Sequence, residues 1–231
     1  MTPPTDNDTV LVWDQPVRVI HWLLVLAVAG AWFTSDDDGA RSLHLLFGYS
    51  ALGLLLFRLL WGVIGSRHAR FAQFLRGPAA VVRYLRALFS GHPEPSTGHN
   101  PAGAVAVLLL LALGLGTTIT GALMATGIVG ESLEEVHELL ANSLLVMIGI
   151  HVAGVIVSSV LHRENLARAM LTGRKRGRQG DGITRRSTAV AVAIVIALAG
   201  FWAYGLGVGR LPLGLDAGIE RSDGAGDGDF D

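Results

Sequence analysis

Long uninterrupted apolar stretches dominate the pattern of hydrophobic and polar positions along the chain. Five of them come close to or exceed the roughly 20 residues that a helix needs to cross the hydrocarbon core of a bilayer. Because lipid offers no hydrogen-bond partners to the backbone, such stretches are expected to be helices. They cover approximately residues 17–34, 42–64, 102–125, 136–161 and 187–208.

This pattern predicts an all-α integral membrane protein. Residues 1–172 are expected to form a four-helix transmembrane bundle, and residues 187–208 a fifth, C-terminal transmembrane helix. Between them, residues 173–186 form a basic loop. Residues 209–231 are acidic and glycine-rich, and we expect this tail to be disordered.

The first apolar stretch is not expected to be a cleaved signal peptide. Signal peptides begin with a basic region, whereas the residues before this stretch include Asp6, Asp8 and Asp14 and no lysine or arginine.

Basic residues lie on alternate sides of the predicted helices. The turn at residues 35–39 is acidic, and the turn after the third helix has Glu131, Glu134 and Glu135 and no basic residue. The positive-inside rule therefore places the N-terminus in the cytoplasm and the C-terminus outside, in the periplasm of a bacterial inner membrane. The basic residues of the two cytoplasmic loops are Arg67, Arg70, Arg76, Arg83, Arg86, Arg163, Arg168, Arg174, Lys175, Arg176, Arg178, Arg185 and Arg186.

Composition agrees with a membrane protein and narrows the possible chemistry. Charged residues make up 16% of the chain, against about 25% in soluble domains. The chain has no cysteine, which excludes iron–sulfur clusters, thiolate zinc sites and covalently attached c-type haem. The net charge of −1 gives no indication of a nucleic-acid partner. Any metal must rely on histidine, methionine or oxygen ligands.

Four histidines lie within or at the edge of the apolar stretches, where ionisable residues are costly and indicate function. They are His21, His44, His137 and His151. The 14-residue spacing of the last two puts both on one helix face, about 21 Å apart along the axis. This spacing suits two haems at different depths in the membrane.

Matching depth pairs the four histidines. Measured from the outer helix ends, His44 is level with His137, and His21 is level with His151. The pairs predict two haem b groups with bis-histidine iron. Zinc would need three or four converging ligands, and separate packing roles for the histidines are the alternative.

Residues near these histidines fit a flat ring. Gly48 and Gly154 would leave room for a porphyrin, although glycines also serve close helix packing. Arg58 follows His44 by 14 residues, so it faces the same way at the depth of the inner pair. It could bind a haem propionate, or else extend to the cytoplasmic interface.

The other histidines have simpler interpretations. His162 is expected at the interface, and His68 and His92 in the solvated basic loop. His99 belongs to Gly-His-Asn-Pro (98–101), a typical helix start with asparagine as the cap. It could alternatively shuttle protons for a quinone.

Several stretches together resemble the bacterial cytochrome b561 family over residues 10–172. This family includes the b-type cytochrome subunits of nickel–iron hydrogenases and is similar to the membrane subunit of formate dehydrogenase. The resemblance implies four core helices, two haems b with two histidine ligands each, and electron exchange with a quinone and a partner subunit or c-type cytochrome. The matching features are Val-Trp-Asp-Gln-Pro-Val-Arg-Val-Ile-His-Trp (12–22), His44, Arg-Leu-Leu-Trp-Gly (58–62), Gly-His-Asn-Pro-Ala-Gly (98–103) and the two histidines spaced by 14.

The predicted function is electron transfer across the membrane between a quinone pool and a redox partner. That partner would be a c-type cytochrome or a hydrogenase- or dehydrogenase-like subunit, and the chain would be a component of an oxidoreductase system. Two alternatives are a standalone quinone-linked oxidoreductase and a non-redox membrane module. The acidic tail could dock a basic periplasmic cytochrome or simply be solvated.

Overall fold

Five long helices form the body of the protein in a computed structural model that describes residues 9–90, 97–127, 132–178, 180–208, 210–211 and 215–216. Among these residues, all five are long and apolar enough to cross a membrane, as the sequence predicts. Their bounds are α1 (Gln15–Phe33), α2 (Arg41–Ile64), α5 (Pro101–Ala125), α6 (Ser132–Leu161) and α8 (Thr188–Val208).

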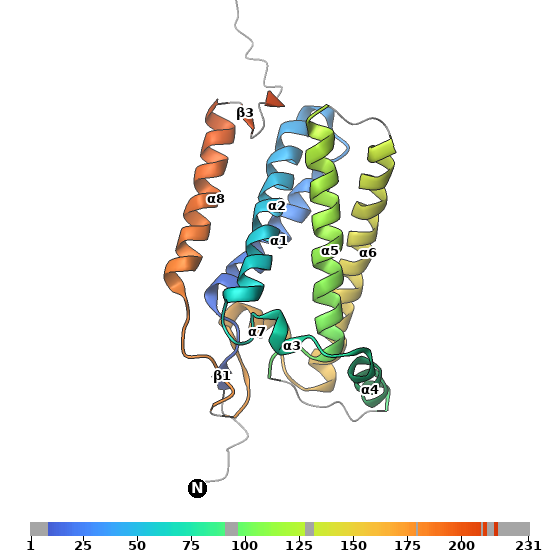
Figure 1. Cartoon of the computed structure of the whole chain (residues 1–231), viewed down its shortest axis with the longest axis vertical. Coiled ribbons are helices and arrows are strands. Elements are labelled where there is room, and N and C mark those ends of the chain that lie inside the picture. Colours follow the sequence, from blue (N-terminus) through green and yellow to red (C-terminus); the bar gives the residue numbers. More distant parts are fainter. Residues whose placement is uncertain are drawn as a thin grey trace, which may run out of the picture.

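The helices pack side by side in an order that differs from their order in the sequence. α2 lies between α1 and α5, α6 packs along α5, and α8 stands at the opposite edge against α1 (Figure 1). In the described part of the chain, α6 packs extensively against α5 and much less against α1 and α2.

Local sequence signals set where the helices begin. The Asp14 carboxylate accepts a hydrogen bond from the Val17 amide at 2.9 Å and caps α1. Asn100 caps α5 in the same way, with Pro101 in the first turn, which confirms the predicted helix start. The fourth membrane helix begins at Ser132 rather than at the expected residue 136, because acidic side chains in the first turn favour a helix N-terminus.

Short elements gather at one end of the bundle, in the segment before α1 and in the two loops that the sequence identifies as basic (Figure 1). The sequence analysis did not predict them. They are β1 (Thr9–Leu11), α3 (Phe71–Phe74), α4 (Pro78–Phe89), α7 (Leu166–Thr172) and β2 (Arg174–Arg176).

β1 pairs with β2 in antiparallel register and joins the start of the chain to the segment after α7. Gly173 makes this connection possible. Its positive φ of 79° ends α7, and its carbonyl accepts hydrogen bonds from the Val12 and Trp13 amides. A Cβ at this position would lie 2.6 Å from the Trp13 carbonyl oxygen, so only glycine fits without a shift.

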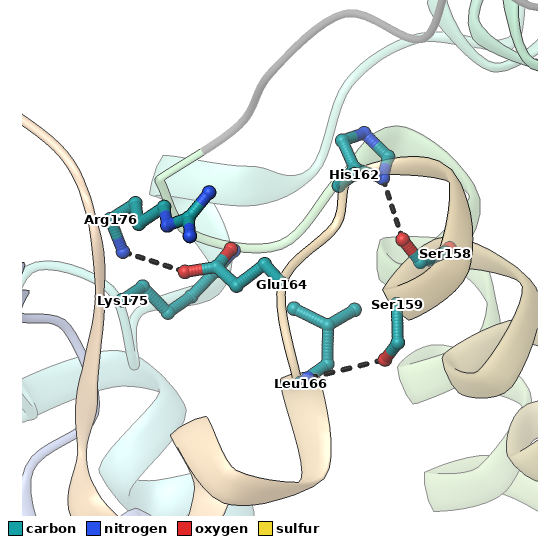
Figure 2. A network of polar contacts seen from close by, with 7 residues as sticks. All are labelled: Ser158, Ser159, His162, Glu164, Leu166, Lys175 and Arg176. Atoms are coloured by element: carbon teal, nitrogen blue, oxygen red, sulfur yellow. Dashed lines mark hydrogen bonds and ion pairs between the residues drawn. The ribbon is translucent and has the colours of Figure 1, made fainter. Parts of the chain in front are cut away.

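A polar network continues from the end of α6 into β2 (Figure 2). The Glu164 carboxylate accepts a hydrogen bond from the Arg176 amide at 2.6 Å and lies 3.9 Å from the ammonium of Lys175. Burial lowers the pKa of Lys175, and Glu164 opposes this shift by attraction. Nearby, the His162 ring bonds to the Ser158 carbonyl. His162 thus sits at the helix end, where the sequence predicts it.

Large apolar side chains on the outer faces of the helices remain exposed, as lipid-facing residues do. Val160 is 70% exposed and Leu139 is 66% exposed. α8 is attached to α2 through Trp202, whose indole nitrogen donates to the Ser50 hydroxyl at 2.9 Å. At the other end of the bundle lie the short η1 (Asp38–Ala40), β3 (Arg210–Leu211) and β4 (Leu215–Asp216). The rest of the predicted tail and His92 lie outside the described residues.

Candidate functional site

His44 and His137 face each other from α2 and α6. Their ring centroids are 6.5 Å apart and their planes make an angle of 72°. The Nδ1 atom of His44 donates to the Ala31 carbonyl on α1 at 2.9 Å. The Nδ1 atom of His137 donates to the Thr117 carbonyl on α5 at 3.0 Å. Both tautomers therefore carry the proton on Nδ1, which leaves Nε2 free to bind a metal.

This separation is compatible with a metal held between two imidazoles. Bonds of about 2 Å from a metal to each Nε2, with about 1 Å from each nitrogen to its ring centre, put the centroids roughly 6 to 6.5 Å apart. Histidine ligands generally donate their second ring N–H to a carbonyl or carboxylate, which fixes the ring. The donor set of His44 and His137 thus fits an iron held between two imidazoles.

His21 and His151 are the second predicted pair. They come from α1 and α6. Both rings are half-buried, and the Nδ1 atom of His21 is buried without a hydrogen-bond partner. This pair is 14 residues along α6 from His137, or about 21 Å. The structure brings the rings of His44 and His137 together, whereas the pairing of His21 with His151 stays a prediction.

Two glycines near these histidines have nothing packed against them. A Cβ placed on Gly48, one turn from His44, would meet nothing within 4 Å, and the same holds at Gly154, three residues after His151. A metal ion without a macrocycle would need at least three protein ligands close together. Among the described residues, no three histidine, aspartate or glutamate side chains form such a cluster.

Arg58 is buried, with 7% of its surface exposed, and does not extend into solvent. Its Nη1 donates to the Ala69 carbonyl at 3.3 Å, and its guanidinium lies 5.2 Å from the centre of the Phe71 ring. Asp14 attracts it electrostatically. Arg58 therefore places a buried positive charge at the end of the bundle that carries the short elements.

His99 lies at the same end, between the rings of Trp13 and Phe74, with centroid distances of 4.6 and 4.4 Å. Its Nδ1 is buried without a hydrogen-bond partner. Burial, reinforced by the positive charges of Arg58 and Lys175, lowers the pKa of His99 to about 3. The ring is therefore neutral at physiological pH. His68, in contrast, bonds to the Asp181 carbonyl at 2.7 Å.

Several residues that support the site were missed by the sequence analysis. Gly121 is one: a Cβ there would lie 2.9 Å from the His137 ring. The Thr120 hydroxyl lies 3.0 Å from Nδ1 of the same ring. The small and hydroxyl residues of the third apolar stretch were the available signal, because such residues mark close contacts between membrane helices.

A membrane-spanning helical bundle in which two histidines of different helices face each other is the arrangement expected of a membrane b-type cytochrome. The sequence profile of the family described as prokaryotic cytochrome b561 matches residues 12–173. The chain belongs to this family. It is a multi-pass membrane protein of electron transport, and family membership implies bound haem b.

Similar proteins agree with this assignment. A probable Ni/Fe-hydrogenase B-type cytochrome subunit of Rhodobacter capsulatus is 26% identical over 215 residues, covering 72% of this chain and 81% of that protein. The protein of the same name from Rhizobium leguminosarum bv. viciae is 25% identical, covering 74% and 90%. The one from Cupriavidus necator is 30% identical, covering 44% and 52%. No solved structure is significantly similar to this chain.

Proposed function

We propose that this chain binds two haem b groups and transfers electrons across a bacterial inner membrane. The facing rings of His44 and His137 carry the proposal, because their 6.5 Å separation and Nδ1 hydrogen bonds suit two residues that would hold one iron. His21 and His151 would hold the second group. Haem supplies reversible one-electron chemistry at iron when it is bound.

The protein would supply fixed ligands. Backbone carbonyls orient the rings of His44 and His137, and a backbone acceptor cannot be lost by a change of rotamer. Arg58 is the candidate partner of a propionate at the inner site, because its charge is buried and it follows His44 on α2 by 14 residues, on the same helix face.

The proposed orientation follows from charge. The end that carries β1, α4 and α7 also carries the basic loops, so it would face the cytoplasm. His44 and His137 would then lie near the periplasmic surface, with His21 and His151 in the inner half of the membrane.

The proposed partners lie at the two ends of this path. The matched relatives are named as B-type cytochrome subunits of Ni/Fe hydrogenase. A hydrogenase-like subunit docked near His44 is therefore the proposed partner, with a c-type cytochrome as the alternative. A quinone pool would exchange electrons with the chain within the membrane.

Haem quantification on the purified full-length protein tests the proposal. We expect a low-spin b-type difference spectrum and about two haems per chain, falling to about one in His137→Ala and in His21→Ala. The matched control is His162→Ala, which removes the histidine that directly follows α6 and should leave about two haems per chain. Absence of a b-type signal, or equal haem content in all four proteins, would contradict it.

A further inference from the structure

An apolar groove of about 670 Å³ lies between α1, the end of α7 and the first turns of α8. The four histidines are not part of it. Its volume is within the roughly 300–1,000 Å³ of typical ligand sites. On α8 its lining runs from Thr188 to Ile196, which is about 12 Å of helix. The groove thus extends from the basic end of the bundle into the apolar region.

The walls of the groove are apolar, whereas its end is cationic. Val19 and Leu23 of α1 face Val192 and Val195 of α8. At the end of the bundle the lining includes Arg18. An amphiphile with an apolar chain and a negative head would complement both parts.

Two arginines supply the positive charge. Arg18 donates from Nε to the Met170 carbonyl at 3.3 Å and from Nη2 to the Leu171 carbonyl. Arg186 is exposed, and its own carbonyl accepts from the Gln15 amide at 3.0 Å, which holds it beside the start of α1.

Arg18 and Arg186 are close enough to repel each other. Neither guanidinium forms an ion pair within the described part of the chain. Arg18 lines the groove, and Arg186 is bonded through its carbonyl to Gln15, another lining residue. An anion bound between these two cations would relieve their repulsion.

We infer that this groove binds one anionic phospholipid. An acyl chain of the lipid would lie between α1 and α8, and its phosphate would lie between Arg18 and Arg186. Basic pockets between transmembrane helices are suited to such headgroups. The lipid would fill the space that α8 leaves beside α1. This gives the fifth helix a role outside the core matched by the family profile, since that match ends at residue 173.

A quinone is the other amphiphile of suitable shape, but it carries no charge for the two arginines. The groove also faces away from the candidate haem ligand of α1. Val19 and Leu23, at 1.5 Å per residue and about 100° per residue, lie roughly 160° round the helix from His21. The charge and the direction of the groove therefore both favour a lipid.

Native mass spectrometry of the full-length protein in mild detergent tests this inference, with phosphatidylglycerol or phosphatidylcholine added. We expect one phosphatidylglycerol to be retained in preference to phosphatidylcholine. Arg186→Gln should weaken its retention about fivefold, and Val192→Trp should abolish it by filling the groove. The controls are Arg83→Gln, an exposed arginine at the same end, and Val160→Trp, an exposed valine of α6.

Haem content and helical circular dichroism of every variant report whether it folds, and Arg186→Gln alone decides the question if Val192→Trp does not fold. Equal retention of the two lipids by the unmodified protein would overturn the inference. So would retention that Arg186→Gln leaves unchanged, or extraction of a stoichiometric quinone in place of phospholipid.

Discussion

The rings of His44 and His137 stand 6.5 Å apart, and each is fixed by a hydrogen bond from its Nδ1 to a backbone carbonyl. Those carbonyls belong to Ala31 on α1 and Thr117 on α5. Four helices therefore meet at one pair of side chains. Substitutions that crowd a ring or shift one of these helices should change the site even when both histidines are retained.

Gly121→Val should crowd the His137 ring, because even a Cβ at this position would lie 2.9 Å from it. The hydrogen bond to Thr117 limits how far the ring can turn away. We expect about tenfold weaker haem retention at this site, as for other changes to residues that orient a metal ligand. Haem per chain after purification measures this. Gly53→Val, where a Cβ meets nothing within 4 Å, should retain full haem content.

Asp14→Ala should lower the stability of the folded protein by about 2–4 kcal/mol. The carboxylate of Asp14 is 1% exposed, caps α1 at Val17 and accepts from the Trp61 indole at 2.9 Å. Thermal unfolding in detergent measures the loss. Asp14→Asn keeps an acceptor and should lose less. The idea fails if Asp14→Ala is as stable as Asp36→Ala, which changes an exposed aspartate.

His99 should make the protein sensitive to acid. Burial lowers its pKa from 6.5 to about 3, so between these values the unfolded chain binds a proton that the folded protein does not. This contribution to stability is complete above pH 6.5 and decreases as the pH falls, by about 2 kcal/mol at pH 5. His99→Phe keeps an aromatic ring beside Trp13 and Phe74 but cannot titrate.

Thermal unfolding midpoints of the unmodified protein and His99→Phe, compared at pH 8 and pH 5, measure this effect. The stability lost between the two pH values should be smaller in His99→Phe. Equal losses in the two proteins would show that protonation of His99 does not contribute.

Arg58→Met should lower the midpoint potential of one haem on the order of tens of millivolts, because a buried cation favours the reduced iron. Potentiometric titration followed in the visible spectrum measures this shift. The control is Arg67→Met, which removes an exposed arginine at the same end of the bundle. A potential unaltered by Arg58→Met would leave Arg58 with a structural role only, through Ala69 and Phe71.

Much of this architecture follows from local features of the sequence. Apolar length predicts the membrane helices, and Asp14 and Asn100 mark two of the helix starts, because capping depends only on neighbouring residues. The association of His44 with His137 could be predicted because a helix has a fixed rise per residue and the membrane aligns helix ends. The charge of the loops indicates an orientation because basic loops stay on the cytoplasmic side of the membrane.

Other features depend on contacts between distant residues. β1 pairs with a strand more than 160 residues away, and no local pattern indicates that pairing. The approach of Gly121 to His137, and the carbonyls of Ala31 and Thr117, depend on how helices are rotated against each other. Rotation is set by packing of whole helix faces.

The sequence by itself determined the five membrane helices and predicted the depths of the four histidines, because hydrophobic length and helical rise act along one segment at a time. Only the tertiary structure decided which carbonyls hold His44 and His137, and that Arg58 is buried beside Phe71. It also decided that Arg18 lines an apolar groove between α1 and α8, and that the Arg186 carbonyl accepts a hydrogen bond from Gln15 at the start of α1. These relationships depend on lateral packing, which brings together residues from helices that are far apart in the chain.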